Sequence, residues 1–252
     1  MLKMMKYEIK RNRLSYFFML AVLLLLELVF SVGMLLEKEV VFSLSIIGLM
    51  FFGFAGILFV AINGTNIYSK DLKKKTGYMV FMTPISSYKV LGAKLLAVFC
   101  SSLVLLIIYV GIGLIDVFWV IEAYSIKEFE PLVKQVFGIE NFTFVALAEY
   151  GVWIVVYGYI ILNVVISFGY LSISLAATLL QNKKGKGLIA DAIFIGLLVL
   201  LGYVEGKLFG ANVGDTFTAM LIAGLPGILF ELACGIAAFW GAAYMLEHKI
   251  NL

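Results

Sequence analysis

The sequence predicts an all-α membrane protein with six transmembrane helices. Its 252 residues are 63% hydrophobic, with a mean hydropathy of +1.07. Only 14% are charged, compared with about 25% in soluble domains. Most of the 19 Lys and Arg residues gather in 1–14, 70–94, 183–186 and at 249. The apolar stretches between them are long enough to cross a bilayer, which takes about 20 residues. Because basic loops stay in the cytoplasm, both termini are predicted to be cytoplasmic.

The predicted elements follow from this alternation. Residues 1–13 alternate apolar and basic residues at helical spacing, which suits either an N-terminal interfacial helix or a plain orientation signal. The stretch 205–223 is too short to cross twice and too apolar to lie in water, so it is predicted to form an outer re-entrant hairpin. Pro226 is predicted to start the last span. The six predicted spans cover about 14–36, 42–66, 90–115, 149–179, 188–204 and 224–246.

The chain is predicted to form one transmembrane domain, residues 1–252, because no aqueous segment is long enough to fold separately. Its net charge of +3 lies mainly in the cytoplasmic loops. The charge therefore indicates orientation and not nucleic-acid binding. Lys94 is expected near the inner edge of span three, where its side chain can reach water.

Charged residues within spans are candidate functional residues, since a charge at bilayer depth must face protein or water. Glu27 and Glu231 are such candidates. Glu27 is interpreted either as lining a translocation path or as a hydrogen-bonded contact between helices. Asp116 lies near an outer edge, where solvation is expected. Phe51, Phe52 and Phe59 are interpreted either as lining a path for apolar cargo or as lipid-facing and core residues.

The segment from about Ile67 to Tyr88, between spans two and three, contains more than the few lysines that are needed to orient the chain in the membrane. Its lysines are followed by apolar side chains that are costly to leave in water. These side chains should pack on the membrane surface or on a partner. The apolar residues concerned are Tyr78, Val80, Phe81 and Met82.

This segment resembles the corresponding part of many permeases of the ATP-binding-cassette type-2 exporter family. It carries Asp71 followed by Lys73–Lys75, and then Thr76-Gly77, in the reverse of the usual order. Thr83-Pro84-Ile85-Ser86 and a lysine, Lys89 or Lys94, follow. The six-span layout, the N-terminal helix and the outer hairpin extend the resemblance over most of the chain.

The resemblance implies a multi-pass permease subunit in a bacterial plasma (inner) membrane, paired with a second copy of itself or with a close relative. Two separate ATPase subunits would bind ATP and Mg²⁺ and dock on a cytoplasmic coupling helix within residues 67–83. The implied cargo is an amphipathic or hydrophobic peptide, as in exporters of toxins or antimicrobial peptides; ions, drugs or lipids are alternatives. The implied docking residues are Asp71, Lys73, Lys74, Lys75, Thr76, Gly77, Tyr78, Phe81 and Met82.

No catalytic motif is found in the sequence. A phosphate-binding G-x-x-x-x-G-K-[ST] loop is absent, and one histidine cannot form a zinc-protease ligand pair. The chain is therefore predicted to be a non-catalytic subunit that binds no metal or cofactor. An ATP-independent secondary transporter is the alternative, although it usually needs coupled ionisable residues and an internal repeat.

Overall fold

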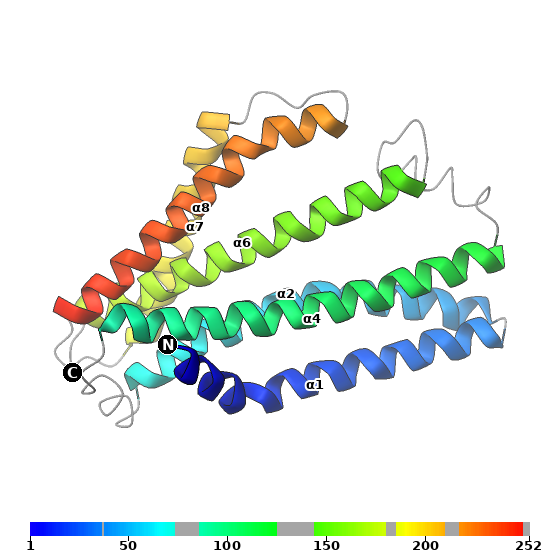
Figure 1. Cartoon of the computed structure of the whole chain (residues 1–252), viewed down its shortest axis with the longest axis horizontal. Helices are drawn as coiled ribbons and strands as arrows, with labels where there is room; N and C mark the ends of the chain where they lie inside the picture. The colour runs from blue at the N-terminus through cyan, green and yellow to red at the C-terminus, as the bar shows by residue number, and fades with distance from the viewer. Residues whose placement is uncertain (37, 74–85, 125–143, 180–184, 210–216, 249–252) are drawn as a thin grey trace.

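The computed structural model describes residues 1–36, 38–73, 86–124, 144–179, 185–209 and 217–248 (Figure 1). These residues form α-helices and no strand, which confirms the all-α prediction. The helices are α1 (Leu2–Leu35), α2 (Glu39–Lys73), α4 (Ser87–Tyr124), α6 (Phe144–Leu179), α7 (Lys186–Phe209) and α8 (Phe217–His248).

All six described helices are long and apolar enough to cross a membrane, as predicted. The shortest, α7, has 24 residues and is therefore about 36 Å long. The hydrocarbon core of a bilayer is about 30 Å thick. The helices extend beyond most of the predicted spans, and the membrane boundaries and the orientation stay predictions.

The bundle is narrow at one end and spread at the other. The helices converge where Met1 and the end of α8 lie, and they diverge toward the opposite end (Figure 1). At the narrow end, a side chain at Gly92 of α4 would come within 4 Å of both Met1 and Phe239 of α8. The two ends of the described chain therefore lie on the same side of the bundle.

The buried core lies in the converging half. Tyr68 of α2 and Tyr170 of α6 are completely buried there, as are Ala242 and Ala243 of α8. Small side chains such as alanine let helices approach closely in a membrane. The alanine side chains on the buried face of α8 therefore allow the helices to pack tightly at this end.

An aromatic layer holds three helices together at the spread end. The ring of Phe30 in α1 lies 5.6 Å from that of Phe42 in α2 and 6.4 Å from that of Trp119 in α4. Phe30 is only 1% exposed. The first three helices therefore stay packed along their length, whereas α6 diverges from α4 toward this end (Figure 1).

Helix α2 continues past the predicted end of span two. Span two was expected to end at residue 66, with a cytoplasmic segment from Ile67, but α2 continues to Lys73. Ile67, Tyr68 and Asp71 are all buried against neighbouring helices. Tertiary contacts thus extend the helix past the apolar run. The rest of the predicted coupling helix, from residue 74 to residue 83, lies outside the described residues.

Helix α8 begins before its predicted span. Pro226 was predicted to start that span and lies inside α8, nine residues after the first helical residue; where the span begins stays a prediction. A proline removes one backbone donor, whereas leaving the helix at membrane depth would leave many backbone groups unsatisfied. The helix therefore continues through Pro226.

The predicted outer hairpin is not confirmed. Residues 205–209 belong to α7 and residues 217–223 belong to α8, while residues 210–216 lie outside the described residues.

The predicted interfacial helix is joined to span one. Leu2–Leu35 is one continuous helix, and its first turns run at an angle to the remainder (Figure 1). A continuous helix avoids a second pair of helix ends with unsatisfied backbone groups. Whether the first turns lie in the membrane interface stays a prediction.

Candidate functional site

Four charged side chains from three helices meet at the narrow end of the bundle. We call this set, Glu8, Arg11, Asp71 and Lys94, the charged cluster. The Lys94 Nζ atom lies 2.6 Å from Glu8 Oε1 and also donates a hydrogen bond to Asp71 Oδ2. Arg11 Nη1 donates to Asp71 Oδ1 at 3.1 Å. Arg11 Nη2 lies 2.7 Å from Glu8 Oε2, an ion pair whose angles fall outside hydrogen-bond geometry.

The cluster is largely withdrawn from solvent and its formal charges balance. The side chain of Lys94 is 2% exposed, and those of Asp71 and Glu8 are 8% and 9% exposed. Only Arg11, with 32% exposure, reaches the surface. The interpretation of Lys94 as a residue reaching for water was therefore wrong, because two carboxylates inside the bundle bind its ammonium group.

Local helix preferences do not explain this arrangement. Asp71 lies in the last turn of α2, where the helix dipole disfavours a negative charge. The two cations compensate for this position. Removing one partner of a buried ion pair costs about 3–5 kcal/mol, because the other charge stays buried without compensation. The cluster thus joins α1, α2 and α4 at a single point.

One turn before Asp71, a second contact joins α2 to α6. The hydroxyl groups of Tyr68 and Ser174 lie 2.7 Å apart, and the rings of Tyr68 and Tyr170 lie 5.0 Å apart. All three residues are completely buried. The last turns of α2 are therefore fixed to α1 and α4 by charge and to α6 by hydrogen bonding and ring packing.

Removal of the hydroxyl group is expected to change the stability of the protein in opposite directions at the two buried tyrosines. Tyr68→Phe removes the hydrogen bond to Ser174 and should destabilise the protein by about 0.5–1.5 kcal/mol. The Tyr170 hydroxyl has no partner among the described residues, so Tyr170→Phe should stabilise it by about 1 kcal/mol. Thermal unfolding midpoints in detergent, followed by fluorescence-detected size exclusion, measure both. A lower midpoint for Tyr170→Phe would show that this hydroxyl is satisfied after all.

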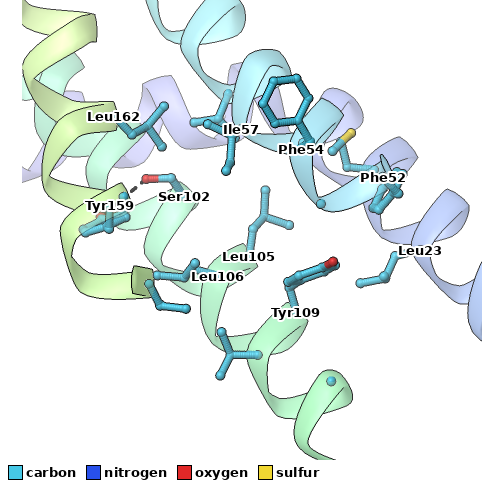
Figure 2. A pocket seen from close by; sticks show the side chains of 18 of the residues that line it. Leu23, Phe52, Phe54, Ile57, Ser102, Leu105, Leu106, Tyr109, Tyr159 and Leu162 are labelled. Carbon is cyan, nitrogen blue, oxygen red and sulfur yellow. Dashed lines mark hydrogen bonds between the residues drawn. The ribbon is translucent and has the colours of Figure 1, made fainter. Parts of the chain in front are cut away.

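A cavity of about 510 Å³ lies between α1, α2, α4 and α6 in the part of the bundle where α6 diverges. Figure 2 shows its lining side chains converging from these helices, with the Tyr109 ring directed toward Leu23 and Phe52. The lining holds no charged residue. Its size lies in the range of about 300–1,000 Å³ that is typical of ligand sites.

Gly53 shapes one wall of this cavity. A Cβ atom at Gly53 would lie 2.9 Å from Cζ of Tyr109. The absence of a side chain at Gly53 therefore allows the Tyr109 ring to pack directly on the backbone of α2. The Tyr109 hydroxyl then donates a hydrogen bond to the backbone carbonyl of Leu49 at 2.9 Å. On the opposite wall, the Tyr159 hydroxyl donates to the carbonyl of Phe99 at 2.6 Å. These phenol donors are satisfied by backbone acceptors.

The three phenylalanines proposed to line a path have different positions. Phe52 lines the cavity, whereas Phe51 is 73% exposed on the outer surface of the bundle. Phe59 packs against the buried core. Successive residues of a helix point about 100° apart, so one run of aromatic residues is distributed over three environments.

Glu27 lies opposite another carboxyl group. The side chains of Glu27 in α1 and Asp116 in α4 are within hydrogen-bonding reach of each other. Glu27 Oε2 and Asp116 Oδ1 are buried and accept no hydrogen bond from the described part of the chain. Asp116 was expected to be simply solvated, and this expectation was wrong because the α1–α4 contact places it against Glu27.

Glu231 also has a carboxyl partner. It is 6% exposed and lies within hydrogen-bonding reach of Glu205 in α7. The close approach depends on Gly227, where a Cβ atom would lie 3.1 Å from Glu205 Oε1. Two carboxyl groups can form a hydrogen bond only if one carries a proton. Each pair can therefore hold a proton or a cation.

Sequence reasoning missed the partners in all three charged sites. Glu8 is the one acidic residue among the basic residues of positions 1–14, and this isolation was the available signal. Of the predicted docking residues, Asp71 faces the protein interior in the charged cluster. The side chains of Lys73 and of the remaining docking residues, Lys74, Lys75, Thr76, Gly77, Tyr78, Phe81 and Met82, lie outside the described residues.

The described residues contain no group of three or more His, Cys, Asp or Glu side chains placed to hold a metal ion. The chain matches no protein-family model, and no curated protein or solved structure is significantly similar to it.

Proposed function

We propose that this protein is the permease subunit of an ATP-driven exporter of the ATP-binding-cassette type-2 kind. One observation carries the proposal. The end of α2, directly before the lysine-rich segment, is fixed to α1 and α4 through Asp71 and to α6 through Tyr68. A force applied to residues 74–83 would therefore move the ends of four helices together.

In this proposal, two copies of the chain pair in a bacterial plasma membrane, and one ATPase subunit docks on each. ATP and Mg²⁺ bind to the ATPases, and the permease itself is not an enzyme. Closure of the ATPases pushes on residues 74–83, and the charged cluster transmits the movement to the spans. The cargo is an amphipathic or hydrophobic peptide, with ions, drugs or lipids as alternatives.

Copurification tests the docking step. The affinity-tagged chain is expected to retain the ATPase encoded beside its gene, and a Lys74→Glu/Lys75→Glu variant is expected to lose it. A Lys183→Glu/Lys184→Glu variant is the matched control, because it makes the same change of charge in the other predicted cytoplasmic loop. Equal retention of the ATPase by both variants would refute docking at residues 74–83.

A secondary transporter is the second candidate, and the carboxyl pairs favour it. Intramembrane carboxyl groups are typical of proton and ion relays, and both Glu27 and Glu231 have a carboxyl neighbour. Transport by the purified chain in liposomes separates the two candidates. Uptake driven by a pH gradient without ATP would support the secondary transporter and overturn the exporter.

A further inference from the structure

The Glu27–Asp116 pair lies next to the apolar cavity along α1 and α4. Leu23 lines the cavity, and Glu27 follows it by one helical turn on the same face. On α4, Tyr109 lines the cavity and Asp116 follows by seven residues, two turns along that face. The carboxyl pair therefore lies just beyond one end of the cavity, about one helical turn past Leu23 and Gly113.

The cavity selects an elongated apolar group. Its lining on α4 runs from Ser102 to Gly113, which corresponds to about 16 Å along the helix axis. The Tyr109 and Tyr159 donors are engaged with backbone carbonyls, and Ser102 donates to the carbonyl of Phe99 at 3.0 Å. A polar ligand would find few available partners there. A hydrocarbon chain would lose no hydrogen bond on entering the cavity.

The carboxyl pair selects a cation. In the charged cluster, cationic side chains lie within 3.1 Å of both carboxylates. No ion pair among the described residues involves Glu27 or Asp116. Their oxygens Oε2 and Oδ1 are nevertheless buried without a hydrogen-bond donor. A buried acceptor without a donor is costly, and an ammonium group with three donors would satisfy this pair.

The cavity is open to the surroundings of the bundle. Met50, Phe54 and Ile154 line it, and each of them is more than half exposed. Toward the spread end, the aromatic layer with Phe30 lies one turn beyond Glu27. A ligand would therefore enter from the bilayer, where amphiphiles are concentrated.

We propose that this site binds a cationic amphiphile, with its apolar chain in the cavity between α1, α2, α4 and α6 and its ammonium group between Glu27 and Asp116. As a statement about cargo, the inference rests on the proposed export function and specifies a cationic member of the amphipathic class. As a statement about binding, it requires only this chain.

Thermal unfolding of the purified chain in nanodiscs of neutral lipid tests the site, with dodecylammonium as the probe and dodecanol as its uncharged counterpart. A ligand that binds the folded state raises the unfolding midpoint. Dodecylammonium is expected to raise it, with native mass spectrometry showing one bound molecule per chain. Dodecanol is expected to bind about tenfold more weakly, because it cannot form the charge-assisted contact.

Matched variants separate the two halves of the site. Gly158→Leu fills the cavity where a Cβ atom meets nothing within 4 Å, so both ligands should lose their effect. Gly151→Leu on the same helix, equally open but outside the cavity, should behave as the wild type. Glu27→Gln should remove the preference for the cation, whereas Glu231→Gln in the other carboxyl pair should retain it.

An unchanged dodecylammonium shift in Gly158→Leu would overturn the site, since the shift would then come from the bilayer. Equal binding of dodecanol to the wild type, or an unchanged preference in Glu27→Gln, would overturn the role of the carboxyl pair. The ATPase subunit is absent from these binding measurements. A negative result for ligand binding is therefore distinguishable from a negative result in the copurification experiment.

Discussion

Replacing Lys94 with methionine is expected to lower the free energy of unfolding by about 3–5 kcal/mol. Methionine keeps much of the volume of lysine but removes the ammonium group that binds Glu8 and Asp71. Both carboxylates would then be left with Arg11 alone, whose side chain is 32% exposed. The thermal unfolding midpoint in detergent, measured by fluorescence-detected size exclusion, reports the loss.

Two controls isolate the charge effect at Lys94. Lys89→Met removes a lysine from an exposed position of the same helix and should change the midpoint little, since isolated surface charges contribute little. Adding Asp71→Asn to Lys94→Met should restore part of the stability, because one fewer buried charge lacks a partner. A Lys94→Met protein as stable as Lys89→Met would show that the charged cluster does not hold the helices together.

Replacing Gly33 with leucine is expected to destabilise the protein by at least about 2 kcal/mol through overpacking. A Cβ atom at Gly33 would lie 3.0 Å from the backbone nitrogen of Phe42 and 3.1 Å from its Cα atom. Backbone atoms of a helix cannot move aside as a flexible side chain can. Helices α1 and α2 would separate, and the contact of Phe30 with Phe42 would be lost.

Gly111→Leu is the matched control for Gly33→Leu. Gly111 lies in α4 with nothing within 4 Å of its Cβ position, and leucine has a better helix propensity than glycine. The control should therefore unfold at the same temperature as the wild type or slightly higher. Equal midpoints for the two variants would show that α1 and α2 are not in close contact at Gly33.

The sequence predicted the large features of the fold because their cause is local. A run of about 20 apolar residues makes a helix in a membrane whatever its neighbours are, so six such runs predicted six helices. Helices continue past the ends of the predicted spans where tertiary contacts extend them. Buried Tyr68 and Asp71 prolong α2, and Pro226 does not interrupt α8.

The candidate site could be predicted only in part. Glu27 and Glu231 were recognisable as costly residues within spans, and each is buried or partly buried against a second carboxyl group. The partners were not recognisable, since Asp116 was expected to be solvated near an outer edge and Glu205 was assigned to the predicted outer hairpin. Lys94 resembled an orienting lysine for the same reason.

By itself, the sequence determined that this protein is helical, that its helices have membrane-spanning length and that a basic segment follows the second of them. Hydrophobic burial and backbone hydrogen bonding act along a single segment, so composition is sufficient to predict them. Only the tertiary structure decided that Glu8 meets Lys94, 86 positions away, and that a cavity forms beside Glu27 and Asp116. Such contacts depend on how helices pack, and the residues of one helix do not specify which side chain a neighbouring helix will present.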